Sequence, residues 1–133
     1  MPIQGDTSGL LKLFNATTPS LVTSSYNQLV HLRHTPSLAS GALRHGVNWT
    51  QIEERYFNNK PQVVVIDDFL SEEALEGLKV WSEDSTIWWD VRSQGYLGAD
   101  MGTGFANGLL IQVSNELTRN LPRIFKGLNL LYT

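Results

Sequence analysis

Three histidines are the residues of this sequence best suited to bind a metal ion. His31 and His34 are three positions apart, a spacing that places both side chains on one face of a helix. A catalytic site for iron also needs a carboxylate, but residues 7–52 contain no Asp or Glu, and His45 follows a helix break at Pro36. We therefore interpret all three histidines as surface or partly buried side chains and expect no metal site in this chain.

Two further pairs of neighbouring residues attract attention because of their chemistry. Asp67 and Asp68 are adjacent, so in a strand their carboxylates would point to opposite faces, and we interpret them as turn and capping residues. Trp88 and Trp89 also point to opposite faces, which predicts one ring in the core and the other beside a groove. Trp88 and Tyr96 are the candidates for aromatic side chains at the edge of a pocket, although for Tyr96 a structural role is the favoured interpretation.

Residues 95–104 contain four glycines and are expected to form a loop. A phosphate-binding loop would require Gly-Lys-Ser/Thr or the spacing Gly-x-Gly-x-x-Gly. Gly98, Gly102 and Gly104 match neither pattern. The sequence therefore does not predict a nucleotide site.

Composition excludes several classes of protein. The 133 residues contain no cysteine, so a disulfide framework and a thiolate metal site are both excluded. Residues 1–60 carry a charge of +2 and residues 61–133 a charge of −5, which argues against a nucleic-acid surface. The N-terminus lacks the pattern of a signal peptide, and no apolar run is long enough to span a membrane. We expect an intracellular, cytoplasmic protein with no membrane partner.

The strongest local pattern covers residues 62–89. Four successive β-branched residues, 63–66, predict a strand that is buried on both faces. Ser71 is placed to cap a helix whose apolar stripe contains four residues spaced by one, three and three: Ala74, Leu75, Leu78 and Trp81. Residues 86–91 are rich in β-branched and aromatic side chains and predict a second strand, followed by a turn at residues 93–95.

A second helix is predicted after Asn107, which can cap it, and Pro122 ends it. Its apolar stripe consists of Leu110, Val113, Leu117 and Leu121. Earlier in the chain we expect a loosely ordered leader with an apolar patch at residues 10–14, and then helices at residues 26–33, 36–44 and 49–57. Residues 128–132 resemble the opening of another strand.

Several of these segments occur together in an order typical of one family. They are residues 64–77 (VIDDFLSEEALEGL), 85–88 (STIW), 95–99 (GYLGA), 104–106 (GFA) and 121–125 (LPRIF). In this order they resemble the N-terminal part of a prolyl-hydroxylase-like 2-oxoglutarate and Fe(II)-dependent oxygenase domain, over residues 59–133. The resemblance implies an α+β fold: supporting helices and the first strands of a double-stranded β-helix (jelly roll), incomplete here, after a helical preface at residues 1–58.

The resemblance also indicates what this chain lacks. The family binds Fe(II) through a His-x-Asp/Glu motif and a distant second His, which leave open positions for 2-oxoglutarate and oxygen. None of the three histidines begins such a motif, and all precede the region of resemblance. We therefore expect no catalytic, cofactor-binding or metal-binding residue in this chain, with Fe(II), 2-oxoglutarate and a protein or peptide substrate belonging to a full-length parent enzyme. The alternative is a non-catalytic interaction module that retains this scaffold and self-associates through an exposed sheet edge.

Overall fold

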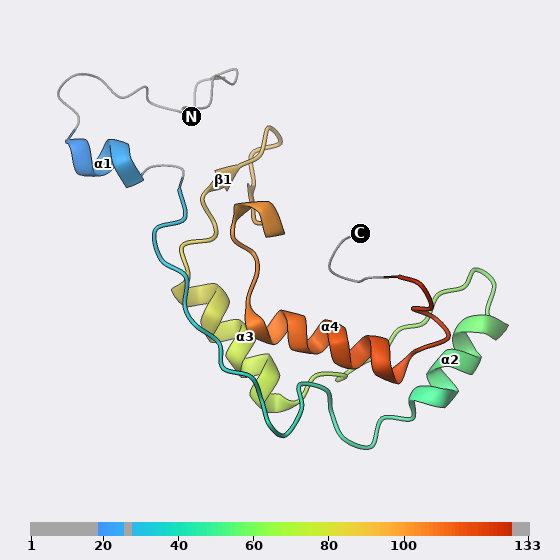
Figure 1. The fold of residues 1–133 in the computed structure, drawn as a ribbon. Helices are drawn as coiled ribbons and strands as arrows, with labels where there is room; N and C mark the ends of the chain where they lie inside the picture. Colours follow the sequence, from blue (N-terminus) through green and yellow to red (C-terminus); the bar gives the residue numbers. More distant parts are fainter. Residues whose placement is uncertain (1–18, 26–27, 129–133) are drawn as a thin grey trace.

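The computed structural model describes residues 19–25 and 28–128. In chain order these contain α1 (Ser20–Ser25), α2 (Trp49–Asn58), α3 (Glu72–Asp84), β1 (Asp90–Val91), β2 (Leu97–Gly98), the short 3₁₀ helix η1 (Met101–Thr103) and α4 (Gly108–Asn120), as Figure 1 shows. The expected α+β class is confirmed at this level, because helices are combined with a small two-stranded antiparallel sheet. The apolar patch predicted at residues 10–14, and residues 129–132 of the last predicted strand, lie outside the described residues.

Helix α3 begins where the sequence predicted. The hydroxyl of Ser71 accepts a hydrogen bond from the N–H of Ala74 at 3.2 Å, which satisfies one of the free amides of the first turn. Ala74 and Trp81 are both fully buried, as their spacing predicted. Leu75 was wrongly placed in the buried stripe, since it is 58% exposed. It faces away from α4 because a helical residue next to a buried one is rotated by about 100°.

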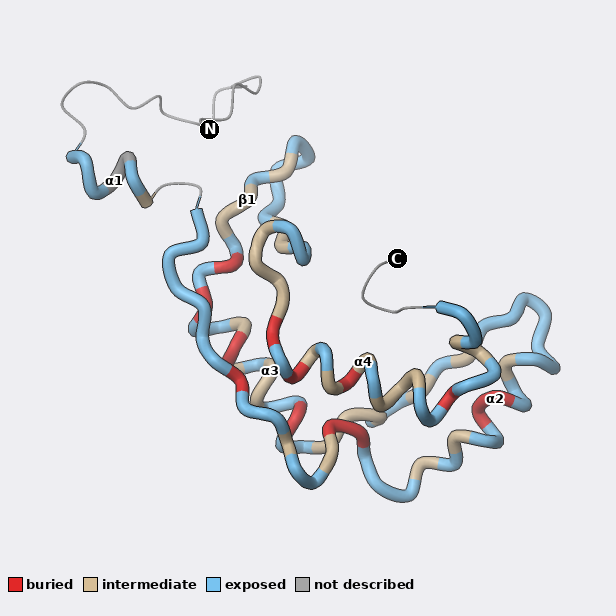
Figure 2. The backbone as a smooth tube through the Cα atoms, viewed as in Figure 1, coloured by how far each residue is buried: buried red, intermediate tan, exposed pale blue. Residues whose placement is uncertain are grey.

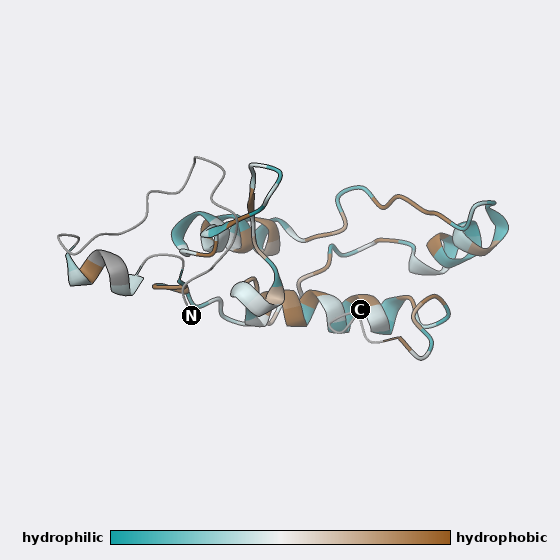
Figure 3. Cartoon of the chain, turned by 90° about the horizontal axis from the view of Figure 1, so that it is seen from above, coloured by the Kyte–Doolittle hydropathy of each residue, from teal (hydrophilic) through white to brown (hydrophobic). Residues whose placement is uncertain are grey.

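Helix α4 is capped by Asn107, whose side-chain oxygen accepts from the N–H of Leu110 at 2.8 Å. Val113 and Leu121 are buried as predicted, but Leu109, outside the predicted stripe, is more buried than either of them. Its side chain packs on Gly77 of α3, where an added Cβ would lie 3.1 Å from the Leu109 Cδ2. The first turn of α4 is strongly apolar (Figure 3), and buried residues gather where α3 and α4 meet (Figure 2).

Both strand predictions need correction. Residues 63–66 have no regular secondary structure and do not belong to a sheet, and Val63 and Val65 are 58% and 67% exposed. β-branched residues favour an extended backbone, yet a strand also needs a neighbouring chain with which to exchange hydrogen bonds. Of the strand predicted at residues 86–91, only Asp90–Val91 pairs in the sheet, because the chain turns at residues 86–89 as it leaves α3.

Strands β1 and β2 form a short hairpin in which Val91 lies opposite Leu97. The N–H of Gly95 donates to the carbonyl of Arg92 at 2.9 Å, which closes the turn predicted at residues 93–95. Gly95 has a φ of 83°, a conformation that glycine adopts without strain. The hairpin and α2 lie at opposite ends of the pair formed by α3 and α4 (Figure 1).

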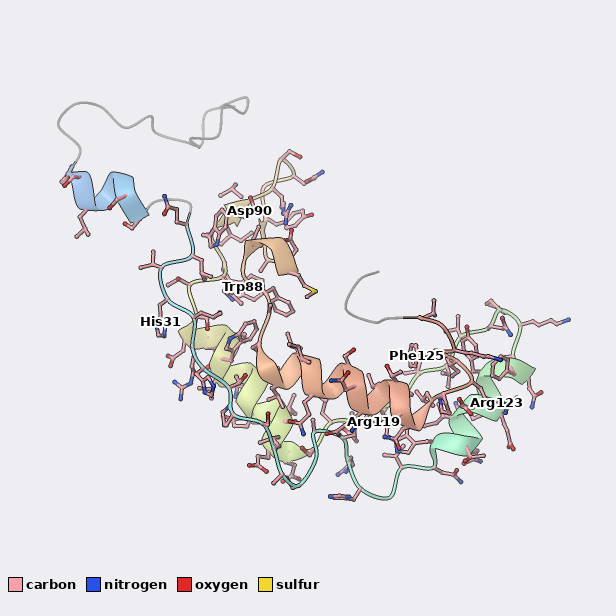
Figure 4. All side chains as sticks on the ribbon, viewed as in Figure 1. His31, Trp88, Asp90, Arg119, Arg123 and Phe125 are labelled. Carbon is pink, nitrogen blue, oxygen red and sulfur yellow. The ribbon has the colours of Figure 1, made fainter. Side chains whose placement is uncertain are left out.

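Helix α2 confirms the prediction for residues 49–57, and a buried carboxylate connects it to the chain after α4. Glu53 is 5% exposed and accepts hydrogen bonds from the backbone N–H groups of Arg123 at 2.6 Å and Ile124 at 3.4 Å. The guanidinium of Arg123 lies 4.7 Å from the centre of the Phe57 ring. Figure 4 shows Arg123 and Phe125 beside α2.

Residues 29–43, which we call the arm, are mainly extended, so the helices predicted for residues 26–33 and 36–44 are wrong over the described part of those ranges. The arm runs antiparallel to α3, because successive bonds join it to ever earlier residues of that helix region. These bonds are Thr86 N to His31 O (2.9 Å), Arg33 N to Ser85 Oγ (3.0 Å), Ser40 Oγ to Glu73 Oε2 (3.1 Å) and Ser71 N to Ala42 O (2.9 Å).

The same arm runs parallel to α4. Its bonds on that side are Leu109 N to Thr35 Oγ1 (3.4 Å), Leu38 N to Gln112 Oε1 (2.8 Å) and Ala42 N to Glu116 Oε2 (2.9 Å). The arm therefore lies along the junction of the two helices. In place of helical hydrogen bonds, its backbone bonds to side chains of α4 and of the turn after α3, which is why its own sequence did not reveal its conformation. These bonds also join the two expected parts of the chain, 1–58 and 59–133, directly.

Candidate functional site

A groove of about 250 Å³ lies between the arm and α3. We call it the arm groove. Its apolar lining includes Leu38 from the arm, Val80 from α3 and Leu109 from α4, and Gly77 leaves the helix surface flat between them. A cavity of this size accommodates one or two side chains, since pockets for drug-sized ligands are about 300–1,000 Å³.

Helical periodicity explains why α3 forms one wall of this groove. Glu73, Glu76, Gly77 and Val80 all line it, and their spacing of three, one and three places them on one face of the helix. The two carboxylates belong to the first two turns, and Val80 lies deeper along the helix. The wall therefore changes from acidic to apolar along the helix axis.

The charges around the arm groove are mostly acidic on the α3 side. Glu73 accepts the Ser40 hydroxyl at 3.1 Å, and the nearest cation to Glu76 is Lys79, with 3.9 Å between Nζ and Oε2. On the arm side, Arg33 forms an ion pair with Asp84 at the end of α3, so its charge is already matched. Nothing here resembles a nucleophile activated by an adjacent base, and the arrangement is suited to binding rather than to catalysis.

One end of the arm is fastened by Thr86, which follows α3. Its hydroxyl accepts from the backbone N–H groups of Val30 at 3.0 Å and His31 at 2.8 Å, and it donates to the carbonyl of His31 at 3.1 Å. The Ser85 hydroxyl adds a bond from the N–H of Arg33. These hydroxyls supply the pairing that a neighbouring strand would otherwise supply.

The other end is fastened by Gln112 and Glu116 of α4. The Gln112 amide bonds both the N–H and the carbonyl of Leu38, each at 2.8 Å. The Glu116 carboxylate accepts from the backbone N–H groups of Ala42 at 2.9 Å and Leu43 at 3.0 Å. Burial alone would raise the pKa of Glu116, but hydrogen bonds from Gln112, Ala42 and Leu43 outweigh it and leave the pKa below its ordinary value.

A second groove, of about 280 Å³, lies on the opposite side of the arm along α4. Its lining is largely polar and includes Ser37, Gln112, Glu116 and Arg119. Two of these side chains, Gln112 and Glu116, are already bonded to the arm. We therefore assign this groove to the attachment of the arm rather than to a ligand.

The two aromatic residues proposed for a pocket edge lie at the hairpin end of the molecule, and neither lines the two grooves. Trp88 is 48% exposed, and its indole N–H donates to the carbonyl of Ser82 at 3.0 Å. Tyr96 is 57% exposed and immediately precedes β2. The tryptophan buried in the core is Trp81, whose ring packs edge-on against Phe105 with centroids 5.2 Å apart.

The hairpin also carries a small ion-pair cluster. Nη2 of Arg92 lies 2.9 Å from a carboxylate oxygen of Asp100 and 3.1 Å from one of Asp90. The hydrogen bond with Asp100, and then the charge of Asp90, raise the pKa of Arg92. The same hydrogen bond is the main cause that lowers the pKa of Asp100. Because the cation is flanked by two carboxylates, the cluster stabilises the hairpin and does not offer an anion site.

Of the three histidines, only His34 lines the arm groove, together with Glu73 and Glu76. His31 and His34 lie on the extended arm and His45 in the turn after it, so the helical face that would have brought the first two together does not exist (Figure 4 labels His31). Within residues 19–25 and 28–128, no group of three or more His, Asp or Glu side chains could hold a metal ion. None of the helices in these ranges has the length and apolar character needed to cross a membrane.

The polar residues that build this region were missed in the sequence. Thr86, Gln112 and Glu116 make their defining bonds to residues 55 to 74 positions earlier in the chain. Only Gln112 and Glu116 had a local signal, because they are polar residues on the same turns of α4 as its apolar stripe. Comparisons of the chain with protein-family models, with curated proteins and with solved structures find no match.

Proposed function

We propose that this chain is the N-terminal supporting part of a prolyl-hydroxylase-like 2-oxoglutarate and Fe(II)-dependent oxygenase, and that it has no catalytic activity by itself. In the parent enzyme Fe(II), 2-oxoglutarate and the hydroxylated peptide or protein substrate would bind to residues outside this sequence. The proposal rests on the order of the five segments that resemble the family, and on one feature of the fold.

That feature is the apolar face of the hairpin. Val91 and Leu97 lie opposite each other and are 44% and 53% exposed. A two-stranded hairpin is only marginally stable by itself in water, and further strands or a helix normally cover its apolar face. In a double-stranded β-helix the following strands would supply this cover, and the exposed residues 63–66 would gain a partner in the same way.

A second function is favoured by the open edges of the hairpin. In the described chain β1 pairs only with β2, so each strand has an unpaired edge. Such an edge can add a strand from another chain, which would make this chain an interaction module that self-associates.

The test is to sequence the source transcript through and beyond the codon for Thr133. An in-frame His-x-Asp within a few tens of codons, followed by a later His, is the expected result. The encoded longer product should then consume 2-oxoglutarate in the presence of Fe(II), and replacement of that His by Ala should stop the consumption. A stop codon directly after Thr133 would refute the oxygenase proposal and favour the interaction module. Stoichiometric Fe(II) binding by this chain that required His31 and His34 would also contradict the proposal, because it places the metal in this chain.

A further inference from the structure

We propose that the arm groove binds an extended peptide in which a basic residue stands two positions from an aliphatic one, so that both side chains point to the same side of the peptide. This inference is independent of the oxygenase proposal, because it concerns binding by residues of this chain and requires no turnover. Three features of the groove lead to it: its size and apolar lining, the charge of its helical wall, and the free backbone of the arm.

The apolar lining selects an aliphatic side chain. Leu38, Val80 and Leu109 leave about 250 Å³, enough for a Val or Leu side chain with part of its backbone. Gly77 keeps the helix surface low at this point, and its contact with Leu109 shows that the two helices are already close together beneath the groove. A ligand side chain placed here would lose contact with water on most sides.

The α3 wall selects a basic side chain on the same side of the peptide as the aliphatic one. This helix carries five acidic residues and one lysine: Glu72, Glu73, Glu76, Glu83, Asp84 and Lys79. Asp84 is neutralised by Arg33, whereas Glu73 and Glu76 face the groove and, among the described residues, have no cation closer than the 3.9 Å contact of Glu76 to Lys79. A Lys side chain is long enough to lay its methylenes along the apolar lining and bring its ammonium group to these carboxylates.

The arm wall can pair with the backbone of a peptide. His34 lines the groove, and within the described chain neither its backbone N–H nor its carbonyl makes a hydrogen bond. The residues on either side of it are fixed: Arg33 N–H is bonded to Ser85, and the Thr35 hydroxyl accepts the Leu109 N–H. A preformed extended segment with free backbone groups favours the addition of a second extended chain.

The test uses the whole chain and a fluorescein-labelled peptide of sequence Lys-Ser-Val-Ser-Lys-Ser-Val, in which Lys and Val lie on one face of the extended chain, with binding followed by fluorescence polarisation. Two control peptides, Glu-Ser-Val-Ser-Glu-Ser-Val and Lys-Ser-Ser-Ser-Lys-Ser-Ser, remove the positive charge and the aliphatic side chains respectively. We expect saturable binding of the first peptide only, weakening as salt is raised because the rim contacts are exposed to solvent.

The decisive variants compare two pairs of glutamates on one helix. Glu73→Gln with Glu76→Gln should weaken binding about tenfold, since each surface ion pair contributes modestly. Glu72→Gln with Glu83→Gln changes the net charge of the same helix by the same amount but leaves the lining of the groove intact, so binding should change less than about twofold. All four side chains are exposed, and the variants are expected to fold.

Several outcomes would overturn the proposal. Equal losses in the two double variants would show that the peptide responds to the overall acidity of α3 and not to the groove. Binding of either control peptide with the affinity of the first, or no binding at all, would exclude the proposed selectivity. A concentration-dependent dimer that disappears in the Glu73/Glu76 variant, without peptide binding, would assign the groove to a second copy of this chain instead.

Discussion

Replacement of Glu116 by Ala tests the way in which the arm is held. The carboxylate accepts two backbone N–H groups, those of Ala42 and Leu43, whose residues are 0% and 6% exposed. A buried donor left without a partner costs about 1–3 kcal/mol. Because Glu116 itself lines a groove open to water, we take about 1–1.5 kcal/mol for each of the two donors. The expected loss of unfolding free energy is about 2–3 kcal/mol.

The assay is urea unfolding followed by tryptophan fluorescence, in which buried Trp81 reports the junction of α3 and the chain before α4. With an m value of about 1–2 kcal/mol/M, the midpoint should fall by about 1–3 M. Glu83→Ala is the matched control, because the Glu83 side chain is exposed and makes no hydrogen bond or ion pair within the described chain. It should change stability by less than about 0.5 kcal/mol. Amide hydrogen exchange should accelerate at Ala42 and Leu43 in the first variant alone.

The effect should also depend on pH with a defined sign. The folded-state pKa of Glu116 lies below its ordinary value of 4.5, so its contribution is fully present above that value and is lost as pH falls through the lower, folded-state pKa. The difference in unfolding free energy between wild type and Glu116→Ala should therefore be constant from pH 7 to about pH 5 and narrow below about pH 4. A difference equal to that of Glu83→Ala, or one that widens in acid, would refute the assigned role of this carboxylate.

Three other predictions follow from single contacts. Thr86→Val should cost about 1–2 kcal/mol and accelerate amide exchange at His31, because its hydroxyl is the acceptor for that amide; unchanged exchange would contradict this. Ser71→Ala should lower the unfolding free energy by about 1 kcal/mol through the loss of the α3 cap, and a Tm equal to that of wild type would contradict the cap. Arg92→Gln should raise the pKa of Asp100 toward its ordinary value of 3.8 in an NMR titration, whereas an unchanged pKa would show that another group lowers it.

Local signals were sufficient to predict the helices that carry the fold. Ser71 and Asn107 were recognised as caps because a cap bonds an amide only three residues away, and both bonds are present. The apolar stripes were placed correctly at Trp81 and Val113 for the same reason. Helix periodicity repeats every few residues, so the pattern is legible without knowledge of the rest of the chain.

The strand predictions were wrong because the pairing of a strand depends on residues that lie far away in the sequence. Residues 63–66 have the composition of a buried strand, but composition describes a preference for extended backbone and does not supply the neighbouring strand. Leu70, a few residues later, forms an isolated bridge with Leu43, a pairing that no local pattern predicts. The helices predicted across the arm failed similarly, since Thr86, Gln112 and Glu116 compete for the backbone groups that those helices would have used.

The two walls of the arm groove are therefore stabilised by different kinds of hydrogen bond. The α3 wall is stabilised by hydrogen bonds within the helix, so its acidic and apolar residues are fixed by periodicity and are visible in the sequence. The arm wall has no internal hydrogen-bond ladder in the described residues and takes its shape from Thr86 at one end and from Gln112 and Glu116 at the other. The position of the arm, and with it the width of the groove, is therefore set by polar side chains of α4 and of the turn after α3. A ligand that fits between the walls would depend on both, although only the α3 wall could be predicted from the sequence.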